Sequence, residues 1–159
     1  MIEAVTLRIA RESDAEAIRS LTREAYSKWV AVIGREPLPM KVDYAAAIRS
    51  HRFDLLFADD RLAALIETVP EGDLLLIVNV AVAPGLQGRG YGKRLLKHAE
   101  DLAASAGCGG TRLYTNKMFG ANLRLYAALG YQVEREEELN GGVVVHMTKA
   151  LASAQDGSR

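Results

Sequence analysis

A glycine-rich turn near the middle of the chain carries the clearest chemical signal in the sequence. It reads Gln87-Gly88-Arg89-Gly90-Tyr91-Gly92 and stands between an apolar run, Leu74 to Ala83, and a segment with helical periodicity. At the start of a helix several backbone N–H groups lack helical partners, and the helix dipole adds partial positive charge. Glycines let an anion approach the backbone, and Arg89, Lys93 and Arg94 add cations. The turn therefore predicts a phosphate-binding site.

The spacing of the turn excludes two common phosphate-binding motifs. A P-loop needs glycine at position 87 and serine or threonine at position 94, where this chain has Gln87 and Arg94. A dinucleotide fingerprint needs a wider glycine spacing and an acidic residue about 20 positions later. Here the glycines lie two apart, and the next predicted strand ends in Thr115-Asn116. Neither motif accounts for the turn.

The elements that must position this turn follow from hydrophobic periodicity and from turn residues. A capping-box spacing at Ser13–Glu16 predicts the start of the first helix, and Gly34 its end. The Pro-containing segment after it, up to Met40, is expected to be an ordered loop with a function. The expected strands are 5–10, 53–58, 61–69, 74–83, 111–115, 131–138 and 143–149, and the expected helices are 13–34, 42–50, 93–107 and 120–129. This order predicts an α/β fold with a central sheet.

Composition and charge exclude several functional classes. The 159 residues are 49% apolar and 25% charged, with 20 basic and 20 acidic side chains, as in one globular domain. We expect that domain over residues 1–151 and an aperiodic tail over 152–159. Zero net charge argues against nucleic acid and acidic membranes as partners, and the single cysteine, Cys108, against disulfides and a thiolate metal site. With no signal peptide or spanning segment in evidence, a cytoplasmic location is expected.

The pattern that remains at 87–92, Gln-x-x-Gly-x-Gly, resembles the acetyl-coenzyme A pyrophosphate loop of the GNAT acyltransferase superfamily. The strand Asn79-Val80-Ala81-Val82 precedes the loop, and Asn122, Tyr126 and the run Leu129-Gly130-Tyr131 resemble the second signature of the same family. The element order also matches the family over nearly the whole chain. The resemblance implies a GNAT-like mixed, mostly antiparallel sheet flanked by helices, and acetyl-coenzyme A as cosubstrate.

The same resemblance implies a role for each residue of these motifs. Backbone groups of Val80 and Val82, on the strand that includes Ala81, would pair with the pantetheine arm as an added strand does. Residues 87–92 and Lys93 would hold the pyrophosphate. Asn122 and Tyr126 lie one helical turn apart, so they share a face that would be directed at the sulfur. Tyr126 is the predicted proton donor to the leaving thiolate, although its ring could instead fill the core.

The residue that removes the acceptor's proton is less well defined by the sequence. The strand Leu74 to Val82 has no acidic residue, and Glu67 on the preceding strand is the nearest candidate base, with Asp73 and His146 behind it. The implied acceptor is a primary amine, either a small molecule or a peptide, held by the first two helices, their Pro-containing loop and the last hairpin. A homodimer is possible from the family. The rival hypothesis is a coenzyme A-binding module without turnover.

Overall fold

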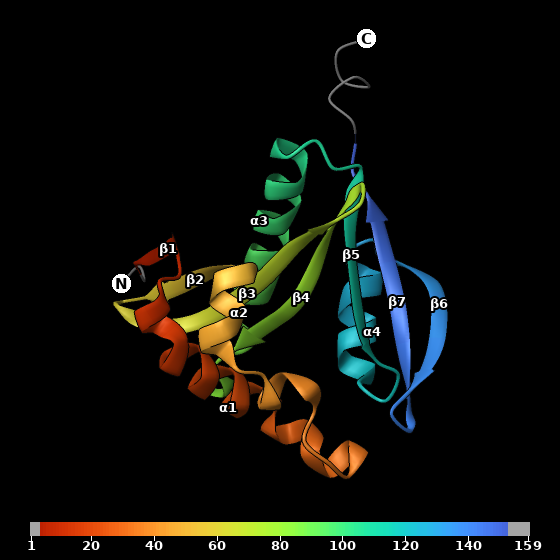
Figure 1. Ribbon diagram of the computed structural model, residues 1–159, viewed down its shortest axis with the longest axis horizontal. Helices are drawn as coiled ribbons and strands as arrows, with labels where there is room; N and C mark the ends of the chain where they lie inside the picture. The colour runs from red at the N-terminus through yellow and green to blue at the C-terminus, as the bar shows by residue number, and fades with distance from the viewer. Residues whose placement is uncertain (1–3, 153–159) are drawn as a thin grey trace. The chain divides into compact units, whose positions relative to one another are not determined.

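The computed structural model describes residues 4–152, which form seven strands and four α-helices (Figure 1). The strands are β1 Val5–Ile9, β2 Arg52–Ala58, β3 Arg61–Glu71, β4 Leu74–Val82, β5 Gly110–Asn116, β6 Gln132–Leu139 and β7 Gly142–Ala150. The helices are α1 Ala15–Ile33, α2 Tyr44–Ser50, α3 Tyr91–Ser105 and α4 Gly120–Ala128. Three short 3-10 turns cover Glu12–Asp14, Leu38–Lys41 and Pro84–Leu86. The predicted element order is confirmed.

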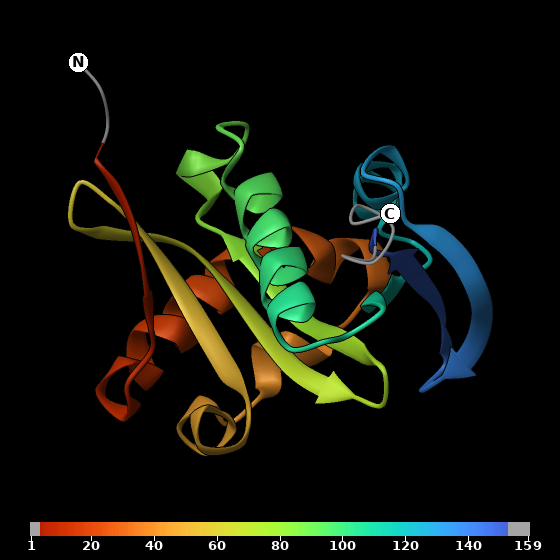
Figure 2. The ribbon, with the colours of Figure 1, turned by 90° about the horizontal axis from the view of Figure 1, so that it is seen from above.

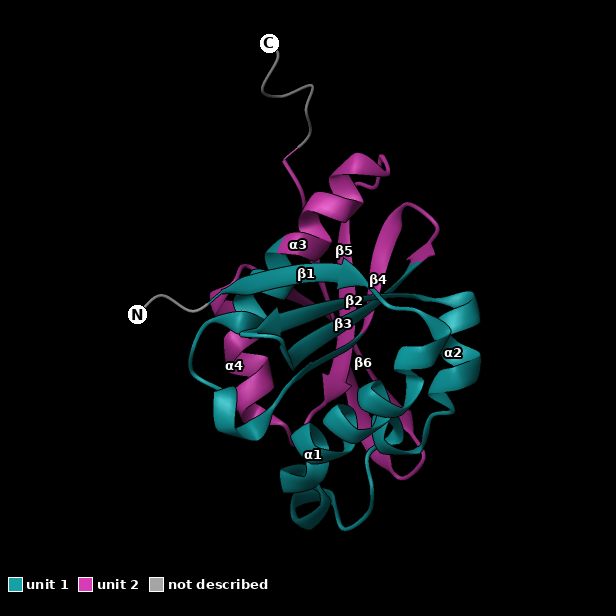
Figure 3. Ribbon diagram, turned by 90° about the vertical axis from the view of Figure 1, so that its left-hand side faces the viewer, with its two compact units in different colours: residues 1–69, 79–97 teal, residues 70–78, 98–159 magenta. Residues whose placement is uncertain are grey.

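The strands hydrogen-bond in the order β1-β2-β3-β4-β5-β7-β6. β1 with β2, β2 with β3, β5 with β7 and β6 with β7 are antiparallel, whereas β4 and β5 are parallel. The predicted mixed, mostly antiparallel sheet is therefore confirmed. The chain divides into two compact units (Figure 3). Unit 1 holds the described residues up to 69 together with 79–97, and unit 2 holds 70–78 and the described residues from 98.

Unit 1 is built around an apolar face that α1 presents to the strands. Ile18, Leu21 and Ala25 recur at three- and four-residue steps and are buried with Phe53 and Leu55 of β2. Figure 2 shows α1 and α2 on one face of these strands and the start of α3 on the other. The helix ends as predicted, because the residue after Ile33 is a glycine at φ +73° whose N–H bonds the fourth carbonyl before it.

The start of α1 differs from the prediction. Ser13 and Glu16 form no capping box. The box forms two residues earlier, where the Asp14 carboxylate accepts the Arg11 N–H at 2.7 Å and also binds the Arg8 guanidinium at 2.8 Å. The Asp14 carboxylate can satisfy a backbone donor and pair with a cation at once, which a serine hydroxyl at position 13 cannot do. The helix therefore begins at Ala15 after a 3-10 turn.

Unit 2 consists of β5, β7 and β6 with the first part of β4, and α4 lies against these strands (Figure 1). The β6–β7 hairpin turns at Asn140-Gly141, both at positive φ, as the sequence predicted. Tyr131 is buried after α4, and its hydroxyl hydrogen-bonds Thr111 Oγ1 at 2.7 Å. The single domain expected over 1–151 stays a prediction, and residues 153–159 of the expected tail lie outside the described residues. Within 4–152, no helix has the length and apolar character needed to cross a membrane.

Candidate functional site

The glycine-rich turn of unit 1 exposes its backbone to any ligand. Gly88 and Gly90 have φ of +85° and +83°, a region that residues with a Cβ rarely adopt, and nothing lies within 4 Å of where a Cβ would stand. At the start of α3 the Arg94 N–H donates to the Gly90 carbonyl. The three amides before Arg94 therefore precede the helical ladder and can bind an anion.

The side chains around the turn divide into exposed and buried groups. Gln87 is exposed, and its side-chain Nε2 lies 3.4 Å from the Val82 carbonyl oxygen. Its side-chain Oε1 lies 3.5 Å from Lys28 Nζ. Arg89 and Lys93 are exposed. The ring of Tyr91 is buried, so Tyr91 can offer a ligand its backbone and not its side chain. The predicted residues of the loop thus fall into amide donors and flanking cations.

The strand before the loop offers backbone groups that its neighbour in the sheet does not use. Among the described residues, the ladder between β4 and β5 pairs Leu74–Ile77 with Gly110–Leu113 and includes neither Val80 nor Val82. The side chain of Ala81 is buried in the core of unit 1. An extended ligand rich in amides can pair with such a strand through main-chain hydrogen bonds.

A buried polar pair stands on the same strand, and sequence reasoning missed one half of it. Asn79 is 4% exposed, and its side-chain oxygen accepts a hydrogen bond of 2.7 Å from the Tyr26 hydroxyl of α1. Its Nδ2 has no partner among the described residues. An asparagine in a buried strand signals that a partner must exist. The sequence does not say which one, because Tyr26 lies 53 positions away.

Glu67, the predicted base, is a buried carboxylate in β3. It is 3% exposed, and Oε2 lies 2.6 Å from Nδ1 of His51, the residue that ends α2. Burial raises the pKa of Glu67, and the hydrogen bond from His51 acts in the opposite direction. His51 was not among the predicted site residues. No local pattern links it to Glu67, because the contact depends on the pairing of β2 with β3.

The second signature lies in unit 2, on α4. Tyr126 is half-buried, and its ring centroid is 5.9 Å from that of Tyr131. Burial raises the pKa of Tyr126 to about 12, so its phenol stays protonated at neutral pH. Among the described residues the Tyr126 hydroxyl has no hydrogen-bond partner. Asn122 is half-buried one turn earlier, and its N–H bonds the Phe119 carbonyl. The two predicted residues share one helix, as expected.

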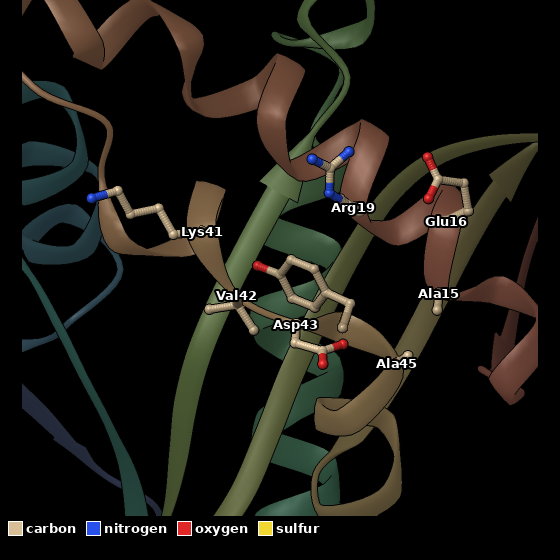
Figure 4. Close-up of a pocket in the computed structure, with 8 residues that line it drawn as sticks. Ala15, Glu16, Arg19, Lys41, Val42, Asp43 and Ala45 are labelled. Atoms are coloured by element: carbon tan, nitrogen blue, oxygen red, sulfur yellow. The ribbon is translucent and has the colours of Figure 1, made fainter.

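An open pocket of about 370 Å³ lies between α1 and the start of α2. Figure 4 shows the charged side chains of Glu16 and Arg19 on α1 and those of Lys41 and Asp43 on the segment that leads into α2. Charges of both signs therefore line it. The pocket lies in the region of unit 1 where the sequence placed part of the acceptor site, beside the first two helices and their connecting loop.

Comparison with known proteins places these features in a wider group. Residues 15–131 match the sequence profile described as the acetyltransferase (GNAT) family. A curated relative, the [ribosomal protein bS18]-alanine N-acetyltransferase of Salmonella typhimurium, is 37% identical over 76 residues. That match covers 48% of this chain and 51% of the relative, so the match spans about half the length of the curated relative.

Solved structures share the fold at low sequence identity. The PaiA N-acetyltransferase of Thermoplasma acidophilum, in complex with coenzyme A, has a TM-score of 0.79 at 20% identity, covering 93% of this chain and 99% of its own. The ribosomal-protein-S18-alanine N-acetyltransferase of Escherichia coli has a TM-score of 0.77 at 19% identity, covering 95% and 96%. At this identity the structures show the fold alone, and they confirm the one that the sequence predicted.

Proposed function

Because the chain belongs to the acetyltransferase (GNAT) family, we propose that it transfers an acetyl group from acetyl-coenzyme A to a primary amine. The match covers the glycine-rich loop, the second signature on and after α4, and the helices and strands between them. The predicted class of enzyme and the predicted cosubstrate agree with the family and with the coenzyme A held by the Thermoplasma structure. The acceptor and the residue roles below are proposals.

The observation that carries the proposal is the open backbone at Gly88 and Gly90. At both glycines the backbone bends and leaves space for an anion beside its N–H groups, and a helix N-terminus follows. This arrangement suits the pyrophosphate of coenzyme A. Arg89 and Lys93 add positive charge at the rim of the loop. These features bind the part of the donor that does not react, and the binding energy aligns the part that does.

The pantetheine arm would extend along β4. Its amides would pair with main-chain groups of Val80 and Val82, which the recorded β4–β5 ladder leaves out. In this arrangement the Val80 N–H donates to the thioester carbonyl and stabilises the negative charge that develops there during attack. The buried Asn79–Tyr26 pair fixes the strand directly before that amide.

Tyr126 would hydrogen-bond the sulfur of the departing thiolate. Its hydroxyl is unoccupied within the described residues, and burial keeps it protonated. Asn122 lies one turn earlier on the same helix face. A phenol whose pKa is near 12 cannot readily give its proton to a thiol near 8.5, so we assign Tyr126 a hydrogen bond to the sulfur and not a full proton transfer.

Glu67 serves the acceptor side of the proposed reaction. Its raised pKa favours a group that can take up a proton, and its carboxylate bonds His51 at the end of α2. The acceptor is a small amine or a peptide N-terminus, and the acceptor named for the Salmonella and Escherichia relatives makes a peptide with N-terminal alanine one obvious candidate. A homodimer, which sedimentation would detect, and a cytoplasmic location remain predictions from the sequence.

A thiol-release assay tests the proposal against its rival, a coenzyme A-binding module without turnover. Purified protein is given acetyl-coenzyme A and a panel of amines that includes polyamines, amino acids and short peptides with free N-termini. The proposal predicts steady release of free coenzyme A with at least one acceptor, above the rate without amine. Binding of the coenzyme with no release across the whole panel would favour the silent module.

A further inference from the structure

The pair formed by His51 and Glu67 has the geometry of a carboxylate–imidazole dyad. His51 Nδ1 and Glu67 Oε2 are 2.6 Å apart, which is short for a nitrogen–oxygen hydrogen bond and typical of one to a charged acceptor. When Glu67 is ionised its oxygens can only accept a hydrogen bond, so in that state Nδ1 carries the proton and Nε2 presents its lone pair. The hydrogen bond therefore selects the imidazole tautomer that can act as a base.

Exposure decides which member of the dyad can meet a substrate. The Glu67 side chain is 4% exposed, whereas the His51 side chain is 31% exposed. Among the described residues Nε2 of His51 has no hydrogen-bond partner. A carboxylate enclosed on nearly all sides can orient a neighbour but has little room to take a proton from a ligand directly. The half-buried imidazole is partly open to solvent.

The dyad lies beside the part of β4 where the thioester is proposed to sit. The Ala83 N–H bonds the Ala63 carbonyl across β3 and β4. Continuing this antiparallel register by two residues places Leu65 opposite Ala81, and both side chains belong to one core cluster. Directly opposed residues on one face of a sheet are close neighbours. Glu67 and Asn79 lie two residues further along β3 and β4, and each bonds a residue of the first two helices or their end, His51 after α2 and Tyr26 of α1.

The dyad lies near a neutral phenol of α2, and a separate polar pair joins α1 to β4. From α2 the Tyr44 ring comes close enough for the Glu67 charge to bear on it, and burial and that charge both raise its pKa. From α1 the Tyr26 hydroxyl is bonded to Asn79 of β4. Arg52, the cation that follows His51 in the sequence, binds the Asp54 carboxylate at 2.9 Å and does not pair with Glu67. No second carboxylate competes for His51 within 4–152.

We propose that His51 is the general base of the acetyl transfer and that Glu67 is its positioning residue. This inference rests on the proposed function and changes the base from the carboxylate to the imidazole. Nε2 takes one proton from the acceptor ammonium, and the freed amine forms the C–N bond at the thioester carbonyl. The C–S bond then breaks, and the remaining surplus proton of the nitrogen goes to the sulfur. His51 returns its proton to water, so RNH₃⁺ and acetyl-coenzyme A give RNHAc, coenzyme A and H⁺.

The kinetic test compares three variants of the full chain with the wild type at saturating concentrations of both substrates. His51→Gln keeps a donor for Glu67 but cannot titrate, and we expect kcat to fall about 10²-fold or more. The dependence of kcat on pH should also differ from that of the wild type, because a glutamine at position 51 takes up no proton. Glu67→Gln should also lower kcat. Arg52→Gln is the matched control, since it removes a cation from a buried carboxylate on the same strand, and we expect kcat within about twofold of wild type.

Chemical rescue separates a base from a structural residue. His51→Gly leaves a space for free imidazole, which should restore kcat in a concentration-dependent way and should not do so in Glu67→Gln. An unchanged kcat and pH profile in His51→Gln, or a folded His51→Gly variant that imidazole does not rescue, would overturn the proposal. Wild-type protein that is silent with every amine would instead refute the proposed function.

A measurement without turnover tests the dyad on its own. Nitrogen-15 spectra of the histidines in the free protein should show His51 protonated at Nδ1 at neutral pH, and Glu67→Gln should change that signal. His51 with its proton on Nε2 alone would contradict the inference whatever the activity.

Discussion

Replacing Tyr126 by phenylalanine tests how the leaving sulfur is stabilised. With the pKa of Tyr126 at about 12 and a thiol near 8.5, full proton transfer would be uphill by about 5 kcal/mol. A hydrogen bond to a charged acceptor is worth about 1.5–3 kcal/mol, and each 1.4 kcal/mol is tenfold in rate. The Tyr126→Phe variant should therefore lose about 10- to 150-fold in kcat, with little change in coenzyme affinity.

Tyr131 provides the matched control in the same unit. Its pKa is also raised by burial to about 12, but its hydroxyl is already bonded to Thr111. Tyr131→Phe leaves the buried Thr111 hydroxyl without that partner and should lower the free energy of unfolding by about 1–3 kcal/mol while kcat stays near wild type. Tyr126→Phe should do the reverse.

Steady-state kinetics from pH 7 to 10 and urea unfolding measure both variants. A phenol with a pKa near 12 also predicts that Tyr126 causes no loss of kcat below about pH 10. Unchanged turnover in Tyr126→Phe would remove the residue from the mechanism. A decrease of 10⁴-fold or more would contradict the hydrogen-bond role and indicate full acid catalysis.

Three further predictions concern the loop, the first helix and the buried polar pair. Gly90→Ala should weaken coenzyme A binding in calorimetry about fivefold or more, because an alanine at φ +83° costs about 1–2 kcal/mol; equal affinity would place the ligand elsewhere. The pKa of Asp14 is lowered to about 2, mainly by its hydrogen bond from Arg8. Up to about 2 kcal/mol of the free energy of unfolding should therefore be lost as the pH falls from 4 to 2. Acid unfolding of the Asp14→Asn variant should lack this loss. Tyr26→Phe should lower the free energy of unfolding by about 1–3 kcal/mol, since the Asn79 oxygen is left buried without its donor, and unchanged urea unfolding would contradict this.

The sequence predicted what local signals encode. Gly34 ends α1, and Asp59-Asp60 and Asn140-Gly141 turn hairpins at positive φ, because each turn is decided by two or three adjacent residues. The loop at 87–92 was predictable for the same reason. The start of α1 was placed on the wrong residues, because Asp14 serves both Arg11 N–H and the Arg8 guanidinium, and the second partner lies on a strand.

The rest of the candidate site depends on contacts between distant segments. Tyr26 meets Asn79, and His51 meets Glu67, only after β2, β3 and β4 have paired and two helices have covered them. The sequence indicated that a buried Asn79 and a buried Glu67 needed partners, and it could not name them. Pattern reasoning therefore named the proposed phosphate-binding loop and Glu67, and it did not name Tyr26 or His51.

Isothermal titration calorimetry of the purified chain with acetyl-coenzyme A tests the central claim most directly. We predict saturable heat with about one site per chain, a similar isotherm for free coenzyme A, and a clear weakening in the Gly90→Ala variant. Titrations of folded wild-type protein that release no heat with either form of the coenzyme at several temperatures would contradict the account.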